Sequence, residues 1–400
     1  MNRACQLFAQ AAAAALVLTV GAPKALAQEF PEVVDRDYAL DLYSGNAIGS
    51  NEIVSMGGAA VAVARGSAGM TVNPAAPAIR SQTSMRRWDW DVHFDALGNV
   101  AGNDFDNNGV EDEASGIRPQ LTFGAVGIVG TWALGIAYSS VSTEADSPTG
   151  SELLASGTAV QLHLAKTLFD NQLIVGGGFR GSTFSVEEGD TDLFALGATA
   201  IEAGVVWAPK NKSYRLGAAG SFPATGQTVE VDQCDPMNCA GLILPERFEV
   251  PWSAAVGVGW RRAPIRWNSK VSTRFIDQKD LTLALDVRVT GSVRDGHGIG
   301  QFAKGRLQRS GDRLAISGRA GAEYTWIPAR LRIRGGAYWE PSRFRDPMGG
   351  TVSGRAHVTA GADVRIFSFH FFRWYRVRLS FTFDGADKYV NSGLSIGFWH

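Results

Sequence analysis

Residues 313–339 read RLAISGRAGAEYTWIPARLRIRGGAYW, and this stretch decides which fold the chain adopts. Apolar and polar residues alternate on both sides of Pro328-Ala329, which predicts two β-strands joined by a tight turn. One face of this hairpin is apolar or small and ends in Trp326 and Trp339, whereas the other carries arginines and glutamates. A soluble sheet would turn its polar face to water. An outer-membrane barrel would turn the apolar face and its aromatic girdle to lipid, and would line its lumen with the polar face.

The N-terminal sequence has the features of a secretory signal peptide over residues 1–27. Arg3 supplies the basic end, residues 11–20 are apolar, and Ala25-Leu26-Ala27 forms a small-x-small cleavage site. After this segment, no apolar run approaches the ~20 residues that a membrane helix needs. A secreted chain of this kind is either soluble or a closed barrel, because both arrangements satisfy the backbone polar groups.

Composition favours the barrel. The chain has 47 Gly, 11 Trp and 21 Phe, and only 19% of its residues are charged. The formal net charge of −1 gives no reason to expect a nucleic-acid partner. We therefore expect outer-membrane lipid to surround this chain.

Residues 84–400 contain fourteen segments with strand periodicity. The even number, and lengths near the ~9–11 residues of a tilted membrane strand, favour an outer-membrane barrel. Long and short connections alternate, as expected when one rim faces outside and the other faces the periplasm, except for an overlong connection at 263–279. No blade-length repeat points to a propeller. We predict an all-β, antiparallel barrel of about 14 strands, with segments at 86–96, 119–128, 131–141, 156–168, 171–183, 194–208, 213–222, 248–262, 280–290, 313–327, 330–340, 353–367, 375–384 and 391–399.

The stretch 56–80, MGGAAVAVARGSAGMTVNPAAPAIR, precedes these segments and has weak strand periodicity. Small residues dominate it, and it contains the element Asn73-Pro74-Ala75. One interpretation is a helix-turn segment that packs in a soluble core. The other, which the following barrel favours, is a compact plug whose small residues let it lie inside the lumen. We predict that residues 28–83 form this plug.

Three stretches resemble the FadL-type family of outer-membrane transporters for long-chain fatty acids and other hydrophobic compounds. They are MGGAAVAVARGSAGMTVNPAA from Met56, LPERFEVPWSAAVGVGWR from Leu244 with LTLALDVRVT from Leu281, and LRIRGGAYWEPSRFRD from Leu331. The first is similar to the N-terminal hatch of the family, which ends in an Asn-Pro-Ala element. The resemblance implies a hatch at Asn73 and Pro74, and a hydrophobic pocket with basic residues. The overlong 263–279 connection and the arginine-rich lumen depart from the family.

Many arginines share the predicted luminal face of the last six strands. Luminal charges commonly pair with one another, because an unpaired buried charge is costly. Alternatively, some guanidinium groups bind the anionic end of a ligand, to which arginine is suited by its bidentate hydrogen bonds. The candidate ligand-binding residues are Arg319, Arg332, Arg334, Arg376, Arg378 and Tyr338. The other predicted luminal arginines are Arg288, Arg313, Arg330, Arg355 and Arg365, and the predicted luminal acids are Asp286, Glu323, Glu340, Asp363 and Asp384.

Two connections carry further candidate sites. The first long loop places Asp104, Asp106 and Asn108 at alternate positions before a glycine, with Asp112 after it. Such oxygen donors begin a calcium loop, although Ser115 stands where a closing glutamate is expected, and a solvated acidic loop is the other interpretation. The longest loop contains Cys234 and Cys239 as CDPMNC, which predicts a disulfide in an oxidising compartment.

The sequence favours a transporter over an enzyme. It contains neither a Gly-x-Ser-x-Gly elbow nor a His-x-x-x-His pair, so we expect no catalytic residues and no cofactor besides possible Ca²⁺. The predicted function is passive uptake of a hydrophobic or amphipathic, fatty-acid-like molecule across the outer membrane. The alternative is a barrel that anchors an envelope-spanning secretion, polysaccharide-export or motility machine through periplasmic partner proteins.

Overall fold

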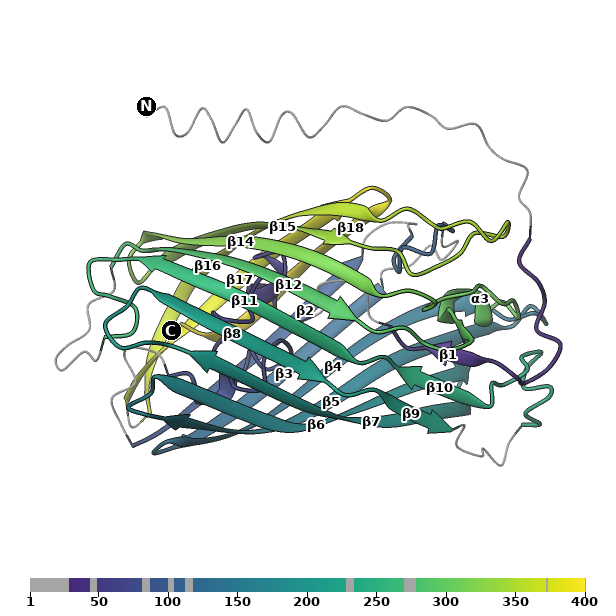
Figure 1. Cartoon of the computed structure of the whole chain (residues 1–400), viewed down its shortest axis with the longest axis horizontal. Coiled ribbons are helices and arrows are strands. Elements are labelled where there is room, and N and C mark those ends of the chain that lie inside the picture. The colour runs from purple at the N-terminus through teal and green to yellow at the C-terminus, as the bar shows by residue number, and fades with distance from the viewer. Residues whose placement is uncertain are drawn as a thin grey trace.

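The chain forms a closed antiparallel barrel of fourteen strands (Figure 1). The computed structural model describes residues 29–43, 49–80, 87–99, 104–111, 118–227, 234–269, 278–371 and 373–399, so the predicted signal peptide lies outside the described residues. Consecutive barrel strands are neighbours, and β18 pairs with β2 to close the wall. The barrel strands are β2 (Trp88–Asn99), β3 (Arg118–Val129), β4 (Trp132–Asp146), β5 (Glu152–Leu168), β6 (Leu173–Glu188), β7 (Thr191–Trp207), β8 (Tyr214–Ser221), β11 (Ser253–Arg262), β12 (Leu281–Thr290), β14 (Ala315–Ile327), β15 (Leu331–Glu340), β16 (Arg355–Phe371), β17 (Arg373–Ala386) and β18 (Tyr389–Phe398).

The alternating apolar and polar residues of the sequence lie on the outer and the luminal face of this wall, respectively. On β14, Ile316 and Trp326 are exposed on the outer face, whereas Ser317 and Glu323 are buried toward the lumen. Large apolar side chains are exposed on many other strands, including Phe179, Ile201 and Leu285. Soluble monomers rarely expose so extended an apolar surface, and a lipid-facing wall requires one. The predicted parity is therefore confirmed for the hairpin that decides the fold.

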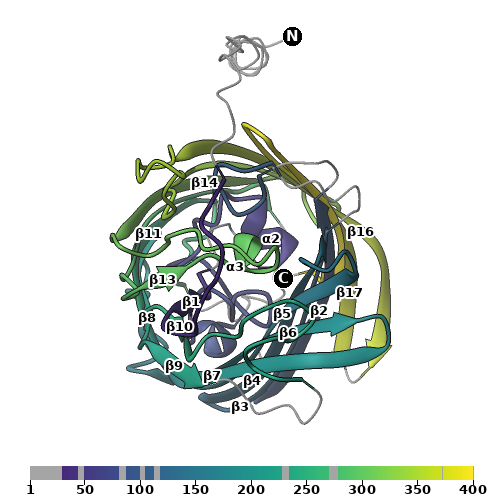
Figure 2. The ribbon, with the colours of Figure 1, turned by 90° about the vertical axis from the view of Figure 1, so that its right-hand side faces the viewer.

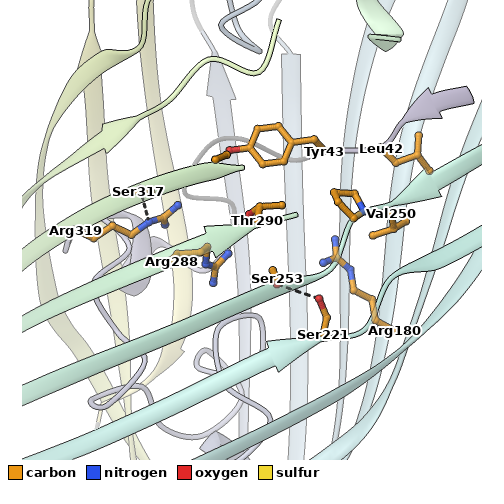
Figure 3. A pocket seen from close by; sticks show the side chains of 12 residues that line it. Leu42, Tyr43, Arg180, Ser221, Val250, Ser253, Arg288, Thr290, Ser317 and Arg319 are labelled. Atoms are coloured by element: carbon orange, nitrogen blue, oxygen red, sulfur yellow. Dashed lines mark hydrogen bonds between the residues drawn. The ribbon is translucent and has the colours of Figure 1, made fainter. Parts of the chain in front are cut away.

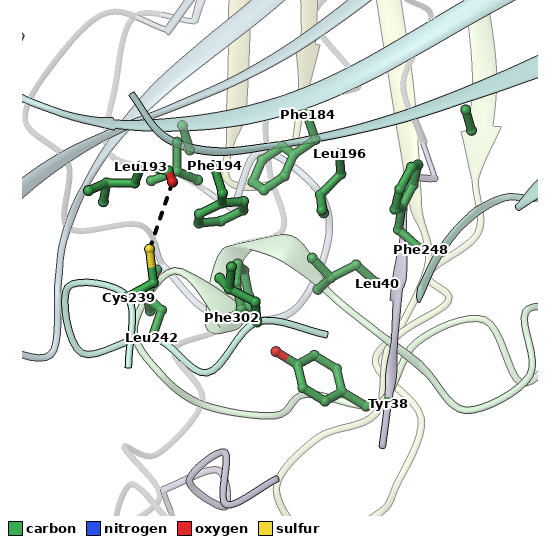
Figure 4. Packing of buried hydrophobic residues seen from close by; sticks show 14 of the residues in the cluster. Tyr38, Leu40, Phe184, Leu193, Phe194, Leu196, Cys239, Leu242, Phe248 and Phe302 are labelled. Carbon is green, nitrogen blue, oxygen red and sulfur yellow. Dashed lines mark hydrogen bonds between the residues drawn. The ribbon is translucent and has the colours of Figure 1, made fainter. Parts of the chain in front are cut away.

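A small four-stranded sheet covers one rim of the barrel, in the order β13-β1-β10-β9. Its strands are β1 (Ala39–Asp41), β9 (Ala224–Gln227), β10 (Arg247–Val250) and β13 (Gly296–His297), and helix α3 (Ile299–Phe302) follows β13. Figure 4 shows the apolar cluster under this sheet, where Tyr38, Leu40, Phe248 and Phe302 pack against the extended ends of β6 and β7. This rim carries the long connections, so we take it as the extracellular rim and call the sheet with α3 the extracellular cap.

Residues 49–80 lie inside the barrel, as the end-on view in Figure 2 shows, and we call them the luminal segment. It contains helix α2 (Asn51–Val54) and the 3₁₀ turn η2 (Ala76–Ala78). Helix α2 contacts β16, β17 and β18, while η2 contacts β3 to β6. Ser50 caps α2 by accepting a hydrogen bond from the backbone N–H of Ile53 at 3.4 Å.

Glycines on the wall allow this close fit. A Cβ atom on Gly176 would lie 2.1 Å from the carbonyl oxygen of Pro74, and one on Gly204 would lie 2.1 Å from Oδ1 of Asn73. Neither contact is sterically possible, so the luminal segment touches bare backbone at both positions. The high glycine content of the sequence thus has a packing cause on the luminal face.

Some predicted boundaries differ from the structure. The predicted strand 248–262 divides at Pro251 into β10, which joins the cap, and β11, which joins the barrel. Proline has no N–H to donate to a ladder, so the strand direction changes there. Strand β4 continues to Asp146 and strand β5 already begins at Glu152. The connection between them is therefore much shorter than the predicted loop 142–155. No helix within the described ranges is long and apolar enough to cross a membrane.

Candidate functional site

Backbone groups of the luminal segment are held by carboxylates of the wall. Asp286 on β12 accepts hydrogen bonds from the N–H groups of Ala60 and Val61 at 2.6 and 2.8 Å. On the opposite wall, Asp95 accepts from the N–H of Asn51 at 2.9 Å. A carboxylate that accepts backbone N–H groups satisfies donors that would otherwise be buried without a partner. These contacts fix the segment against β2 and β12.

Asn73, which was predicted from the sequence as a hatch residue, forms hydrogen bonds within the luminal segment and to β7. Its amide nitrogen donates to the carbonyl oxygen of Val61 at 2.8 Å and to that of Val205 at 3.4 Å, and Oδ1 accepts from the N–H of Ala75 at 2.9 Å. All of its polar atoms are used in this way while the residue is buried. The Asn-Pro-Ala element is therefore a fixed point of the segment in this conformation.

Glu52 of α2 connects the luminal segment to a buried ionic cluster on β14 to β17. Its carboxylate lies 2.9 Å from Arg378 and 3.8 Å from Arg334. Arg334 also forms two 2.6 Å hydrogen bonds to Asp363 and one of 2.7 Å to Glu323, while Arg378 lies 2.8 Å from Asp363. We call these five residues the Glu52 cluster. Its two arginines are matched by three carboxylates.

The arginines determine the ionisation of Glu52. Burial alone raises the pKa of its carboxyl group, but the positive charges of Arg378, Arg334 and Arg65 outweigh burial and lower the pKa to about 2. The carboxylate is therefore charged at neutral pH, and docking of α2 is coupled to that charge.

A second, buried polar cluster combines serine, histidine and aspartate, the residue types of a hydrolase triad. Ser67 Oγ lies 2.9 Å from Nδ1 of His93, whose Nε2 lies 3.3 Å from Asp95. Ser67 also donates to Asp91 at 2.8 Å. All four side chains are buried between the luminal segment and β2. This arrangement anchors the segment.

A cavity between the barrel wall and the extracellular cap is lined by three arginines. Arg180 comes from β6, Arg288 from β12 and Arg319 from β14, and Figure 3 shows their guanidinium groups directed into one space. Leu42 and Tyr43, which follow β1, line its cap side. We call this space the arginine cavity. Its free volume is about 40 Å³, and its remaining lining residues are Ser221, Val250, Pro251, Ser253, Thr290, Ala315 and Ser317.

Carboxylates lie near the arginine cavity but do not line it: Glu202 interacts electrostatically with Arg180, and Asp286 does so with Arg288 and Arg319. No carboxylate is among the described lining residues. Arg319 donates to Ser317 at 3.2 Å and lies 5.3 Å from the ring of Tyr338. Within the described ranges, Arg180 and Arg288 form no ion pair, and the buried Nε of Arg180 has no hydrogen-bond partner. Such a group of guanidiniums is an attractive environment for an anion.

The structure separates the six ligand-binding residues predicted from the sequence. Arg319 lines the arginine cavity, whereas Arg334 and Arg378 belong to the Glu52 cluster. Arg332 lies over the ring of Trp399 at 4.2 Å, and the Tyr338 hydroxyl donates to Asp384 at 2.8 Å. The sixth residue, Arg376, is partly buried near the other rim.

Other predicted luminal residues have varied surroundings. Arg355 and His357 share Glu340 at 2.6 and 3.0 Å, so part of the predicted lattice of ion pairs is present. Arg313 and Arg330 lie outside the strands, in the connections that precede β14 and β15, and are exposed. The alternation of inward and outward side chains holds only within a hydrogen-bonded strand, so it does not determine the orientation of these two arginines.

Sequence reasoning did not select Arg180 as a site residue. It occupies the luminal parity of β6, next to the outward Phe179, in a strand that is otherwise small and apolar at its centre. A lone arginine among glycines was the available signal. Its proximity to Arg288 depends on barrel closure, which no local pattern shows.

The carboxylates of Asp104 and Asp106 in the acidic loop accept hydrogen bonds from backbone N–H groups of the same loop. Asp104 accepts from the N–H groups of Asn108 and Gly109 at 2.7 and 2.8 Å, and Asp106 accepts from Asn108 at 3.2 Å. Asp112 lies outside the described residues. The part of the chain that is described holds no group of three or more His, Cys, Asp or Glu residues suited to a metal ion.

Cys234 and Cys239 form a disulfide with an S–S distance of 2.09 Å in the connection between β9 and β10. Cys239 is buried against Leu193 and Leu242 in the cluster beneath the extracellular cap. The disulfide therefore closes a small loop at the edge of the cap.

No family model and no curated protein matches the chain, but solved structures do. A FadL homologue from Pseudomonas aeruginosa aligns with a TM-score of 0.50 at 12% identity, over 92% of this chain and 98% of that chain. The Pseudomonas putida toluene transporter TodX aligns with a TM-score of 0.52 at 13% identity, over 90% and 99%. The monoaromatic hydrocarbon channel CymD aligns with a TM-score of 0.51 at 12% identity, over 88% and 96%.

Identities this low show the fold alone. The chain therefore has the FadL-type barrel fold, which confirms the resemblance and the fold class expected from the sequence. The fold, together with the apolar outer face of the wall, places the chain in a bacterial outer membrane.

Proposed function

We propose that this barrel passively takes up a hydrophobic or amphipathic small molecule that carries an anionic end, as a fatty acid does. The arginine cavity is the observation that carries this proposal. It brings Arg180, Arg288 and Arg319 together on the luminal side of an outer-membrane wall, without an acidic residue among its described lining. A bound carboxylate would accept hydrogen bonds from these guanidiniums and balance part of their charge.

The fold supports the hydrophobic part of the cargo. The solved structures with this fold include one described as a toluene transporter and one described as a monoaromatic hydrocarbon channel. The arginine cavity is the reason to add an anionic end. Of the six residues first predicted to bind ligand, Arg319 is retained, because the charges of Arg334 and Arg378 are matched by carboxylates.

The route proposed for this molecule runs along the barrel axis. Each barrel strand is hydrogen-bonded to both neighbours, and a lateral opening would leave backbone groups without partners in lipid, at several kcal/mol for each group. Axial passage must displace the luminal segment, which contacts the wall on several sides. We therefore propose that this segment acts as a hatch, with the Glu52 cluster and Asp286 holding it in place.

Uptake of radiolabelled dodecanoate tests the proposal in bacterial cells that lack their own fatty-acid channel. Wild-type protein should accelerate uptake severalfold over an empty vector. The double variant Arg180→Gln/Arg288→Gln should return uptake close to the background. Arg294→Gln is the matched control, because Arg294 is 92% exposed in an extracellular connection, and it should behave as wild type. Equal uptake by the double variant and the wild type would contradict the proposal.

The same cells distinguish the alternative prediction of a machine anchor. A correctly inserted barrel that accelerates neither dodecanoate nor toluene uptake, and that co-purifies with periplasmic proteins, would favour the anchor.

A further inference from the structure

Strand β1 is one of the two inner strands of the extracellular cap, and its two neighbours come from elsewhere in the chain. It pairs in parallel with β10 through residues 39–41 and with β13 through residues 39–40. The N–H of Leu42 donates to Glu249 at 2.9 Å, and that of Ala39 donates to Asp295 at 3.1 Å. Strands β9, β10 and β13 lie in connections between barrel strands. Strand β1 alone among the four can leave the cap without moving a connection of the barrel.

One buried ionic contact ties β1 to the rim. Oδ2 of Asp41 accepts hydrogen bonds from Ser310 at 2.7 Å and from Arg343 at 3.0 Å. The guanidinium of Arg343 also lies 4.5 Å from the ring of Tyr43. Ser310 and Arg343 belong to two different extracellular connections. A single carboxylate therefore holds β1 to both.

The arginine cavity is too small for the whole of the proposed cargo. Its free volume is about 40 Å³, which corresponds to roughly three water molecules at about 10–15 Å³ each. A carboxylate fits in this space, but its alkyl chain does not. Leu42 and Tyr43 line the cavity directly after β1, so the part of the cap that restricts the cavity is continuous with that strand.

We infer that β1 is an extracellular gate of the arginine cavity, and that the contact of Asp41 with Arg343 and Ser310 is its latch. When β1 leaves, β10 and β13 remain about 10 Å apart, which is two strand spacings. A slot that holds a polypeptide strand also admits an extended hydrocarbon chain, which is thinner. The inference rests on the proposed function for the identity of the cargo, and it assigns control of entry to the N-terminal segment.

A reversible cross-link tests the gate in the purified full-length protein in liposomes. The variant Ala39→Cys/Arg247→Cys joins β1 to β10 at paired positions. Thr225→Cys/Glu249→Cys is the matched control, because it joins β9 to β10 and leaves β1 free. Both variants also carry Ser221→Cys, which places a thiol in the arginine cavity. The readout is the rate at which sulfonatoethyl methanethiosulfonate, a small anionic thiol reagent, labels Cys at position 221.

The gate predicts that the 39–247 cross-link lowers this labelling rate at least tenfold, and that reduction followed by removal of the reductant restores it. The 225–249 cross-link should change the rate less than twofold. In protein without a cross-link, Asp41→Asn should raise the rate severalfold, because the latch loses its charge. An unchanged rate on cross-linking β1 would overturn the inference, and so would equal slowing in the control.

The labelling experiment contains no cargo, so it stands apart from the proposed function. If the 39–247 cross-link slows labelling but the protein takes up no dodecanoate, the proposed gate stands and the proposed fatty-acid-like cargo is rejected. If dodecanoate uptake persists with β1 cross-linked, the proposed cargo stands and the proposed gate is rejected.

Discussion

Replacing Glu52 by glutamine should release the luminal segment from the wall. The carboxylate is within 4 Å of Arg334 and Arg378, and its side chain is only 14% exposed. In the docked position its pKa is about 2, below the ordinary value of 4.5 for a glutamate, and each pKa unit corresponds to about 1.4 kcal/mol. Loss of the charge should therefore weaken docking by about 3 kcal/mol, which matches the range for breaking a buried ion pair.

Hydrogen exchange of the Ala60 and Val61 amides measures this effect, because both donate to Asp286 when the segment is docked. At pH 7, Glu52→Gln should accelerate their exchange on the order of a hundredfold. Glu111→Gln is the matched control, since Glu111 pairs with Lys388 on the surface, and it should change exchange little. Acceleration below threefold, or equal acceleration in the control, would refute the assignment of Glu52 as a docking contact.

The pH dependence of docking gives a second readout of the same residue. A carboxyl group whose pKa is lowered by docking stabilises the docked state above its free pKa of 4.5. That stabilisation is lost as the pH falls from 4.5 toward 2. After correction for intrinsic exchange rates, the difference between wild type and Glu52→Gln should be constant from pH 7 to about pH 5, should decline below pH 4.5 and should be gone near pH 2. A difference that persists at pH 2 would show that the charge of Glu52 is not its cause.

Three further perturbations test the packing, the orientation and the cap. Gly176→Ala should weaken docking of the luminal segment by about 1–3 kcal/mol, seen as faster amide exchange, whereas Gly197→Ala should be neutral because its Cβ would meet nothing within 4 Å. Leu285→Arg, on the outer face, should destabilise the barrel by about 2–4 kcal/mol in denaturant titrations in lipid, and no loss would contradict a lipid-facing wall. Reducing Cys234–Cys239 should destabilise its loop by about 2 kcal/mol, measured by local amide exchange, with barrel stability unchanged.

The barrel was predictable because its rule is local. A strand with one face in lipid and one in the lumen must alternate, and the amino-acid order of residues 313–339 displays this alternation directly. Strands β14 and β15 lie within two residues of their predicted bounds. The number of strands follows from counting such segments.

The extracellular cap could not be predicted in the same way. Strand β1 has three residues and β13 has two, too few for a period to appear. Their pairing joins chain segments more than two hundred residues apart, and is decided by long-range packing around Leu40 and Phe248. Pro251 was the one local signal, and it marked the point where a predicted single strand divides between cap and barrel.

The candidate site could be predicted only in part from the sequence, for a related reason. Parity predicted that Arg319, Arg334 and Arg378 share the luminal face, but not which of them meets a carboxylate. Charge matching depends on neighbours from other strands and from the luminal segment. Arg180 joins the arginine cavity from β6, which lies four strands around the wall from β12, and a reading along one strand does not reveal this neighbour.

The most direct test of the arginine cavity is a calorimetric titration of the purified barrel in nanodiscs with decanoate and, in parallel, with 1-decanol. The proposal predicts that wild-type protein binds decanoate at least tenfold more tightly than 1-decanol, since a hydrogen bond to a charged group contributes about 1.5–3 kcal/mol. Arg180→Gln/Arg288→Gln should remove this preference and leave 1-decanol binding unchanged. Equal affinity of the wild type for the two compounds, or a preference for decanoate that survives in the double variant, would contradict the account.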